Sequence, residues 1–566
     1  MAKRIPIGID NFAELTDKKN NYLFVDKTLM LKEFCTDSAK VSLILRPRRW
    51  GKTLNMSMLQ HFFAATVNGL KTKGLFDHLN IAHENQGEYL AYQGKNPVLF
   101  ISFKDIKPSD FNHFIEQTKE LIQELCAQHS ELETSEKLTA EQKHTFKKLL
   151  TQTSNQSELE KSLKTLSTLL QQHYGAKTFI LIDEYDSPLN LMHQEAHFTK
   201  ISDFFNRLFG SALKGNDALE KGIITGILKL SKNNMLSGLN NLSVYSLMEK
   251  KYSQWFGFSE TEVQNLFTEQ QLSVSLQEVR RWYNGYTIGN LYALYNPWSI
   301  INCIENKGAL KPYWIKTGDS GLLKTAISDK ALEEEFNTLL SGKPIRSKIE
   351  DHISFEHIKE GGSSIVWSLL WSLGYLKIME HPDVYSDSYE LKIPNYEVQY
   401  SYQNIFIEFI RAVDQRKYDN LLNSLLSGNI DTFKQHLSDF LLMITSYRDL
   451  NSEKEYHALF LAWTFSLQST HKILSNKEVG LGRPDLILAP ILPSDDLGLI
   501  LEFKYTKPGQ TRSFYESLAE AGLQQIHDKK YDTELKKIPK IKRILKLSIA
   551  FYGKEFICAH NLEYLK

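Results

Sequence analysis

The stretch that decides the fold of the first half of this chain is Val41-Ser-Leu-Ile-Leu45, followed by Arg46-Pro-Arg-Arg-Trp-Gly-Lys-Thr53. The first five residues predict a buried strand, and the pattern from Leu54 to Phe63 predicts a helix. A strand, a loop ending in Gly-Lys-Thr and a helix are the context of a phosphate-binding loop, because backbone N–H groups and the helix N-terminus receive phosphate oxygens. We therefore expect Lys52 to reach the outer phosphates of a nucleotide and Thr53 to bind Mg²⁺.

The loop departs from the usual phosphate-loop pattern at one position. Arg46 stands where the first glycine normally lies, and Gly-Lys-Thr alone can also be an ordinary strand-to-helix turn. We expect the nucleotide to be held where the loop meets the helix, by Arg49, Trp50, Gly51, Lys52 and Thr53. Arg48 and Arg49 suit phosphate charge, but surface arginines beside a loop fit the pattern equally well.

A second motif places carboxylates at the end of another strand. Phe179-Ile-Leu-Ile-Asp-Glu184 is an apolar run that ends in two acidic residues, and open α/β sheets bind ligands at the carboxyl ends of their strands. We predict that Asp183 holds the Mg²⁺ ion together with Thr53, and that Glu184 orients and deprotonates the attacking water. Two acids that merely end a buried strand are the alternative. Asp186 fits a turn or cap residue better than a catalytic one.

The rest of the first half fits a parallel sheet with crossover helices. Val98-Leu-Phe-Ile-Ser102 and Gly222-Ile-Ile-Thr-Gly-Ile227 are further strand candidates, and longer helical patterns separate the apolar runs. Residues 108–172 predict amphipathic helices with a loop near residues 152–157. By analogy with related nucleotide-hydrolysing proteins, Thr225 would lie beside the outermost phosphate.

Composition bounds the class of protein without deciding its function. The chain has 566 residues, 42% of them hydrophobic and 24% charged, which predicts a globular protein of two to four domains. Lys+Arg and Asp+Glu are equal at 67 each, so net charge neither favours nor excludes a nucleic-acid partner. Four scattered cysteines argue against a disulfide framework and a cysteine zinc site. Because the N-terminus does not resemble a signal peptide and no apolar run has membrane length, we expect a cytoplasmic protein without a membrane anchor.

A separate group of charged residues lies near the C-terminus. Gly482-Arg-Pro-Asp-Leu-Ile-Leu488 and Gly498-Leu-Ile-Leu-Glu-Phe-Lys504 are short apolar runs that carry acidic residues. Residues two apart on a strand point to the same face, so Glu502 and Lys504 should project together while Phe503 packs behind them. A hairpin between the two strands would bring Asp485 alongside.

This arrangement suits the hydrolysis of phosphodiesters. We predict that Asp485 and Glu502 hold one or two Mg²⁺ (or Mn²⁺) ions, that the Phe503 carbonyl adds a ligand, and that Lys504 positions or helps activate the attacking water. The alternative is an ordinary exposed ion pair on an edge strand. Glu-x-Lys alone would favour that alternative, and Pro484-Asp485 upstream favours the catalytic interpretation.

Several blocks of the sequence resemble the bacterial AAA-ATPase-like family, which commonly carries a C-terminal PD-(D/E)XK nuclease domain. The missing first glycine is a feature of that family. The blocks are Ile5-Pro-Ile-Gly-Ile-Asp10, Tyr22-Leu-Phe-Val-Asp-Lys27, Arg46 to Thr53, Thr225-Gly-Ile227, Ser237-Gly-Leu-Asn240, Phe256-Gly-Phe258, Tyr283-Asn-Gly-Tyr286 and Tyr295-Asn-Pro297.

The C-terminal group in turn resembles the PD-(D/E)XK nuclease motif, including the literal Pro484-Asp485 pair. This resemblance implies that Glu453, on a preceding helical pattern, is an additional metal contact. It also implies that Gln525 lies on the helix after the core hairpin. Three further residues match positions of that family, namely Asn476, Glu478 and Arg483.

Together these observations predict an α/β chain of three parts: a P-loop NTPase sheet at 1–265, a mostly helical middle domain at 266–395 and a restriction-endonuclease-like PD-(D/E)XK domain at 396–566. The resemblance implies ATP and Mg²⁺ as cofactors, DNA as the partner with RNA left open, and a homo-oligomer as one assembly state. A nucleotide-controlled binding module with an inactive nuclease fold is the alternative. A lysine-rich stretch could contact phosphates or merely solubilise the chain; it comprises Lys529, Lys530, Lys536, Lys537, Lys540, Lys542, Arg543 and Lys546.

Overall fold

The computed structural model describes residues 3–192, 197–229, 239–314, 332–340, 342–350, 362–379, 388–443, 453–464, 467, 470–475, 478–492 and 495–565. Ser237 and Asn476 lie outside these residues. The chain forms two compact units, the first comprising Met1–Gly318 with Pro344–Glu397 and the second comprising Asp319–Lys343 with Val398–Lys566. Each unit has its own sheet.

The first unit is built on a five-stranded parallel sheet with the order β4-β5-β6-β1-β7. Its strands are β1 (Val41–Leu45), β4 (Val98–Ser102), β5 (Thr178–Asp183), β6 (Leu219–Gly226) and β7 (Leu242–Tyr245). All four strands that the sequence predicted are present, and β7 is the addition. Strands β1 and β5 are buried along their whole length, as expected for central strands covered on both faces.

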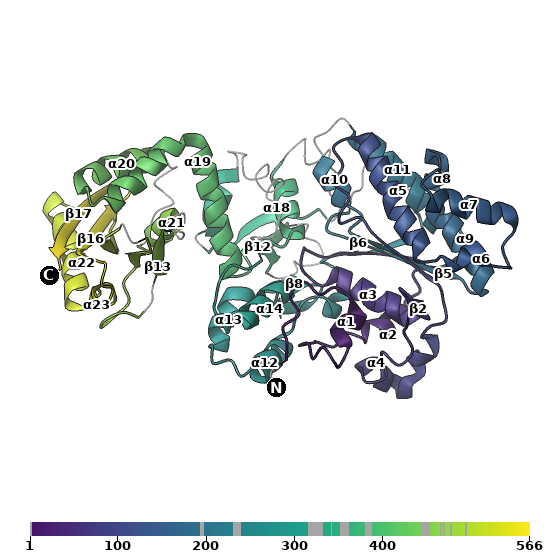
Figure 1. Cartoon of the computed structure of the whole chain (residues 1–566). Coiled ribbons are helices and arrows are strands. Elements are labelled where there is room, and N and C mark those ends of the chain that lie inside the picture. The colour runs from purple at the N-terminus through teal and green to yellow at the C-terminus, as the bar shows by residue number, and fades with distance from the viewer. Residues whose placement is uncertain are drawn as a thin grey trace. The chain divides into compact units, whose positions relative to one another are not determined.

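Helices cover both faces of this sheet, as Figure 1 shows. One face carries α1 (Phe12–Thr16), α2 (Met30–Thr36) and α3 (Lys52–Phe63). The other carries the predicted amphipathic region, whose helices are α5 (Phe111–Ala127), α6 (Glu131–Thr134), α7 (Ala140–Leu150), α8 (Gln156–Glu160) and α9 (Ser162–Tyr174). It also carries α11 (Phe198–Leu213), which follows that region in the chain. Capping boxes start α7 at Thr139 and α8 at Asn155. The loop predicted near 152–157 therefore ends at Asn155, whose side chain accepts a hydrogen bond from a free N–H group at the start of α8.

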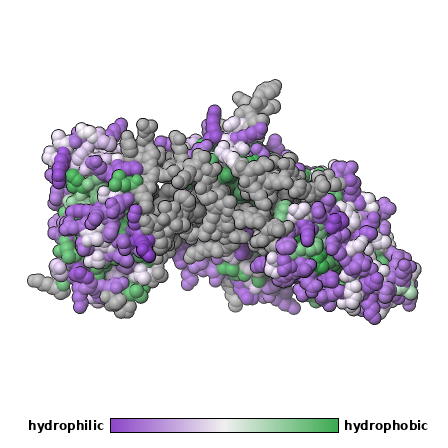
Figure 2. Space-filling model, turned by 90° about the horizontal axis from the view of Figure 1, so that it is seen from above, coloured by the Kyte–Doolittle hydropathy of each residue, from purple (hydrophilic) through white to green (hydrophobic). Residues whose placement is uncertain are grey.

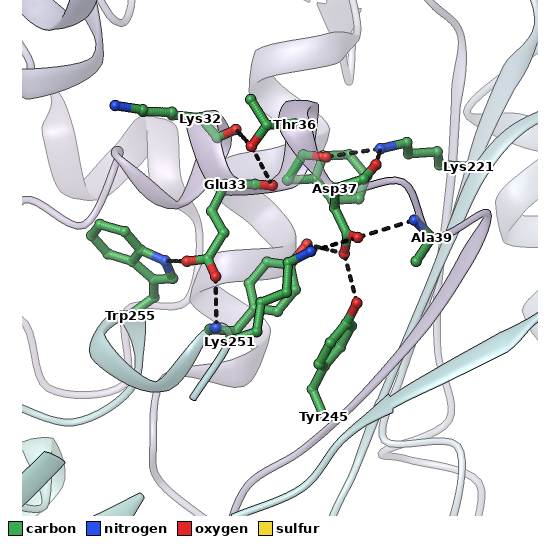
Figure 3. A network of polar contacts seen from close by, with 11 residues as sticks. Lys32, Glu33, Thr36, Asp37, Ala39, Lys221, Tyr245, Lys251 and Trp255 are labelled. Atoms are coloured by element: carbon green, nitrogen blue, oxygen red, sulfur yellow. Dashed lines mark hydrogen bonds and ion pairs between the residues drawn. The ribbon is translucent and has the colours of Figure 1, made fainter. Parts of the chain in front are cut away.

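A buried polar network ties α2 to β7 and the segment after it (Figure 3). The Asp37 carboxylate accepts hydrogen bonds from the Tyr245 and Tyr252 hydroxyls, each at 2.9 Å, and pairs with Lys251 at 2.7 Å. One turn earlier on α2, Glu33 accepts a hydrogen bond from the Tyr252 backbone N–H at 2.9 Å. Since Asp37 is 4% exposed, these partners replace the water that a carboxylate loses on burial.

The remainder of the first unit adds helices and short strands outside this sheet. Its helices include η2 (Ser253–Trp255), α12 (Glu260–Glu269), α13 (Leu276–Tyr283), α14 (Pro297–Glu305) and α18 (Ser363–Ser372). The predicted helical segment also contains strands, which form a hairpin of β8 (Tyr286–Ile288) and β9 (Leu291–Leu294) and a sheet of β10 (Ile345–Lys348), β11 (Lys377–Ile378) and β12 (Ser388–Lys392). Minor elements are β2 (Thr66–Val67), β3 (Leu70–Lys71), α4 (Asn80–His83), η1 (Glu84–Tyr92) and α10 (Ser187–Met192).

The second unit is built on a mixed sheet with the order β13-β14-β15-β16-β17. Its strands are β13 (His471–Ser475), β14 (Leu486–Pro490), β15 (Leu497–Tyr505), β16 (Arg543–Tyr552) and β17 (Glu555–Tyr564). Only the β15–β16 pair is parallel, because α22 (Arg512–Asp528) crosses over between these two strands. Two short helices complete the unit, α16 (Glu333–Leu340) and α23 (Thr533–Lys536).

Alternating residues of the central strand β15 separate a hydrophobic core from a functional face. Leu499, Leu501 and Phe503 belong to a core formed with α19 (Tyr396–Leu426), α20 (Ile430–Met443) and α21 (Glu453–Thr464). The opposite face packs against α22 and carries Glu502 and Lys504. The period of two therefore places the charged pair as the sequence predicted, with Leu501 and Phe503 behind it.

No helix among the described residues is long and apolar enough to span a membrane. Hydrophilic residues cover most of the coloured surface in Figure 2, with hydrophobic residues scattered among them.

Candidate functional site

The phosphate loop of the first unit has the backbone shape that its sequence requires. Gly51, at the cap of α3, has φ +80° and Arg49 has φ +67°, so two residues of this short loop are in the left-handed region. Lys52 begins α3, and its ammonium donates hydrogen bonds to the carbonyl oxygens of Arg46 at 3.1 Å and Pro47 at 3.0 Å. Burial lowers the pKa of Lys52, and the neighbouring Glu184 opposes that effect.

Arg46, which replaces the usual first glycine, is a buried structural residue. Its side chain is 0% exposed. One guanidinium nitrogen, Nη1, donates to the carbonyls of Leu45, Tyr245 and Ser246 at 2.7 to 3.0 Å. The guanidinium also lies over the Phe256 ring, and burial lowers the pKa of Arg46 to about 9. Arg46 therefore fastens the start of the loop to the end of β7 and is not directed at a phosphate.

Replacing Arg46 by glycine, which would restore the usual loop pattern, is expected to destabilise the first unit. The substitution leaves a cavity and removes the donor for three carbonyls, so we expect a loss of about 2 kcal/mol or more in the free energy of unfolding. Urea titration followed by tryptophan fluorescence measures it. Arg48→Gly, at a half-buried position of the same loop, is the matched control with a smaller expected loss. An Arg46→Gly protein as stable as the wild type would contradict this structural role.

Aromatic residues from distant parts of the first unit hold the loop from outside. Trp50 is buried and its ring meets Tyr286 edge-on at 5.0 Å. The Arg49 guanidinium stacks on Trp298 at 4.3 Å, and the Trp314 indole N–H donates to the Arg48 carbonyl at 3.1 Å. Trp50 thus contributes to the loop through its backbone. Two of these residues, Tyr286 and Trp298, lie in or next to sequence blocks that resembled the family, but nothing in those blocks indicated contact with the phosphate loop.

Glu397, at the start of α19, is a buried carboxylate that no sequence motif pointed to. It accepts hydrogen bonds from the Ser299 hydroxyl and the Trp314 backbone N–H, both at 2.7 Å. Burial raises the pKa of Glu397 to about 7. Trp314 also donates a hydrogen bond to the phosphate loop. Glu397 therefore supports the loop indirectly, through Trp314.

The raised pKa predicts that the first unit becomes less stable as pH rises from about 4.5 to about 7. In that window the folded chain keeps a proton on Glu397 that the unfolded chain has lost, so folding is favoured at the acid end. The expected fall is about 2 to 3 kcal/mol. Glu397→Gln should flatten this part of the stability-against-pH curve, measured by urea unfolding at several pH values. Glu305→Gln, at an exposed site on α14, should leave the curve unchanged; equal curves for both variants would refute the assignment.

The predicted Mg²⁺ ligands of the first unit lie together at the carboxyl end of the sheet. The Thr53 hydroxyl donates to Asp183 Oδ2 at 2.7 Å, and the Thr225 hydroxyl donates to Asp183 Oδ1. Burial raises the pKa of Asp183. Glu184, the predicted base, follows at φ +48°, a strained conformation of the kind that concentrates at functional sites.

Asp186 has a structural position instead. Its carboxylate accepts hydrogen bonds from the backbone N–H groups of Ile227 at 2.9 Å and Leu228 at 3.1 Å. It therefore fixes the segment that follows β6, in agreement with the turn or cap role that the sequence favoured.

In the second unit, strand pairing brings Asp485 beside the Glu502 strand. Leu486 pairs with Leu501, so Asp485 is in register with Glu502. Asp485 Oδ2 accepts a hydrogen bond from the Phe503 backbone N–H at 2.8 Å. His457 Nε2 on α21 lies 2.9 Å from the Asp485 carbonyl oxygen. The predicted hairpin is thus confirmed, and His457 is a supporting residue that the sequence did not reveal.

Glu502 is the most deeply buried acid of this cluster. It is 3% exposed, and its Oε1 accepts hydrogen bonds from Lys504 Nζ at 3.0 Å and from the Gln525 amide. Its other oxygen, Oε2, is buried without a hydrogen-bond partner in the described chain. Burial, with Asp485 second, raises the pKa of Glu502 to about 7. Burial disfavours the Lys504 ammonium, but Glu502 outweighs this and the pKa of Lys504 is raised.

Gly522 explains how Gln525 reaches this cluster. A Cβ at Gly522 would overlap the Ser548 hydroxyl and lie 3.3 Å from Lys504 Cγ. The absence of a side chain lets α22 approach β15 and β16 closely, and Gln525 projects from the next turn toward Glu502. Family resemblance pointed to Gln525, whereas the role of Gly522 appears only in the packed structure.

The remaining predicted metal ligands are less closely gathered. Glu453 Oε2 lies 4.0 Å from Lys504 Nζ and its side chain is 46% exposed. The Phe503 side chain is fully buried in the core, so only its backbone can act in the site. Among the described residues no group of three or more His, Cys, Asp or Glu side chains converges as a metal site does. The donors that fit a cation are therefore the carboxylates of Asp485 and Glu502, and the unpartnered, buried Oε2 supports this fit.

Half of the lysine-rich stretch is neutralised by acids of the same unit. Lys546 is buried and pairs with Asp532 and Glu563, each at 2.7 Å. Lys536 binds the same two acids. Lys537 pairs with Glu534 and Arg543 with Asp496. Four of the eight cations of this stretch therefore have acidic partners, and for these four the structure favours the interpretation that did not involve phosphate.

The two units define a class of protein. A parallel sheet with a phosphate loop facing Asp183, and a mixed sheet with paired carboxylates and a lysine, are the folds of a P-loop NTPase and of a restriction-endonuclease-like domain. Comparison with known families agrees: residues 6–236 match the predicted AAA-ATPase family, and residues 451–561 match the PD-(D/E)XK nuclease superfamily. The chain therefore combines an AAA-ATPase-like domain with a C-terminal PD-(D/E)XK domain.

A curated relative is similar to much of the chain. An uncharacterized protein of the vnfD 5' region in Azotobacter chroococcum mcd 1 is 28% identical over 407 residues. The match covers 70% of this chain and 69% of the relative.

Proposed function

We propose that this protein is an ATP-hydrolysing, Mg²⁺-dependent nuclease that cuts DNA phosphodiesters in its C-terminal unit. The observation that carries the nuclease proposal is the Glu502 carboxylate, buried with one unpartnered oxygen, between Asp485 and Lys504. Burying a carboxylate without a complete set of partners costs folding free energy, and sites that tolerate this cost are commonly functional.

In the first unit, the phosphate loop supplies the binding groups. Backbone N–H groups at the start of α3 and the Lys52 ammonium neutralise the phosphates, while Thr53 and Asp183 hold the cation. Glu184 accepts a proton from the attacking water, and Thr225 keeps Asp183 oriented. Lys52 must exchange its two loop carbonyls for phosphate oxygens, which are stronger acceptors because they are charged.

In the second unit, Asp485 and Glu502 hold the cation, with the Phe503 carbonyl and Glu453 as further oxygen donors. The cation, when bound, lowers the pKa of its water and stabilises charge on the phosphate. Gln525 orients Glu502, and the Phe503 N–H orients Asp485. Lys504 stands 3.0 Å from Glu502 and positions the attacking water.

The test is cleavage of linear and circular DNA by the purified chain with Mg²⁺ or Mn²⁺, with and without ATP, beside Glu502→Ala. We expect metal-dependent cutting by the wild type and none by the variant. A difference between the reactions with and without ATP would show that the units are coupled. Cutting that ignores ATP would instead indicate that the first unit does not control the second.

The second candidate is a nucleotide-controlled module that binds DNA or a protein without cutting. Its supporting observation is the lack of a third converging carboxylate among the described residues. ATP hydrolysis without cleavage under any metal condition would favour this candidate.

A further inference from the structure

A short hairpin directly before Asp485 presents an exposed apolar side chain. Val479 and Gly482 form a β-bridge, and Leu481 lies at the turn between them with 67% of its side chain exposed. The Leu481 backbone N–H donates a hydrogen bond to the Lys529 carbonyl at 2.8 Å. Single exposed leucines are common on protein surfaces, but the backbone of this one is fixed by its neighbours.

The hairpin is fixed by contacts that only glycine permits. Gly480 has φ +60°, and a Cβ at this position would overlap the carbonyl oxygens of Lys529 and Lys530. A Cβ at Gly482 would lie 3.0 Å from the Tyr531 hydroxyl. Because neither glycine has a side chain, the hairpin can pack directly against the residues that follow α22. Leu481 is exposed on a rigid support and not on a loose loop.

The same contacts connect the hairpin to the nuclease centre. The Tyr531 hydroxyl lies 3.4 Å from the Gln525 amide nitrogen, which also donates to Glu502. Along the chain, Gly482 is three residues before Asp485. Leu481 is thus held at a defined place beside the cluster that would receive the scissile phosphate.

Cationic side chains flank this leucine. Arg483, Lys529 and Lys530 are exposed and form no ion pair within the described chain, unlike Lys536, Lys537, Arg543 and Lys546. The acids Glu478 and Asp528 are exposed nearby in the sequence. An apolar side chain on a rigid turn between cations has the chemistry of a residue that enters DNA between base pairs while phosphates bind around it.

We propose that Leu481 is a wedge that unstacks a base step of duplex DNA next to the scissile phosphate, with Arg483, Lys529 and Lys530 on the backbone. This inference rests on the proposed nuclease function and adds how the substrate is deformed. Opening a step costs free energy, which the cation contacts offset. The wedge positions the phosphate and takes no part in bond breaking.

The test uses full-length protein with Glu502→Gln, which prevents cutting, and duplex DNA with 2-aminopurine placed at successive positions. We expect a position-specific fluorescence rise on binding. Adding Leu481→Ala should reduce that rise at least about fivefold and weaken binding about tenfold, a loss of about 1.4 kcal/mol. Leu481→Met, which keeps an apolar side chain, should restore most of the signal. Ile491→Ala, at an exposed apolar residue after the other end of β14, is the control with no expected effect.

The possible outcomes distinguish the wedge role of Leu481 from the nuclease assignment itself. An undiminished fluorescence rise in Leu481→Ala would overturn the wedge while leaving the nuclease assignment intact. Equal losses in Leu481→Ala and Ile491→Ala would also overturn it, because the effect would not be specific to the hairpin. No DNA binding by the Glu502→Gln parent, with no cutting by the wild type, would overturn the nuclease assignment and the wedge with it.

Discussion

Asp485→Asn is expected to abolish metal-dependent DNA cleavage, lowering its rate by about 10³-fold or more while ATP hydrolysis continues at the wild-type rate. A thousandfold loss corresponds to about 4 kcal/mol of transition-state stabilisation. Asparagine keeps the shape of the side chain and an oxygen for the Phe503 N–H, so the β14–β15 hairpin is preserved. What it removes is the negative charge that, with Glu502, holds the cation. Initial cleavage rates of supercoiled and linear DNA measure the effect.

The matched control for this prediction is Asp496→Asn. Asp496 lies directly before β15, at the end of the strand away from Glu502, and pairs with Arg543 at 2.6 Å. Losing this partly exposed ion pair should cost no more than about 1 kcal/mol of stability and leave cleavage unchanged. Cleavage that survives in Asp485→Asn, or that fails equally in both variants, would remove Asp485 from the reaction.

Lys52→Ala is expected to reduce ATP hydrolysis by at least about 10²-fold. The lysine is 4% exposed and anchored at the centre of the loop, so its charge is already in place for the phosphates. Losing one preorganised charge at a phosphoryl-transfer site typically costs several kcal/mol. The rate of phosphate release measures hydrolysis, and titration with a fluorescent ATP analogue separates binding from chemistry.

Lys40→Ala is the control, because Lys40 is exposed directly before β1 whereas Lys52 follows its other end. It should hydrolyse ATP normally. If Lys52→Ala also hydrolyses ATP normally, the loop is a structural strand-to-helix turn. DNA cleavage by Lys52→Ala tests whether ATP hydrolysis is coupled to cutting. Unchanged cutting would indicate that the first unit acts only as a structural scaffold for the second.

Local sequence patterns were sufficient to predict the strands and the face of the sheet on which their residues lie. The apolar run from Val41 to Leu45 became β1 with the same bounds, and so did Val98–Ser102 as β4. The alternation around Glu502 correctly separated the core face from the charged face of β15. These features depend on neighbours within a few residues, which is why a single sequence contains them.

Features that depend on distant contacts could not be predicted in this way. Glu397 is 98 residues from Ser299 and 83 from Trp314, and no spacing rule links them. Arg46 looked like an unfilled glycine position, because only the β1–β7 pairing shows which carbonyls it binds. Lys536 and Lys546 looked like part of a cationic surface, because Glu563, which pairs with both, lies on a different strand, β17.

That neutralisation has a consequence for how ionic strength should act on the protein. Each phosphate contact by a free cation releases about 0.9 counterion from duplex DNA, and this number sets the slope of log affinity against log salt concentration. Lys536, Lys537, Arg543 and Lys546 already have acidic partners, so they contribute little to it. With Arg483, Lys529 and Lys530 as the contacts, the slope should be near −3 and not the roughly −7 that the full stretch would give. Binding would then tolerate salt well, and recognition would depend more on the shape and stacking of the DNA than on its charge.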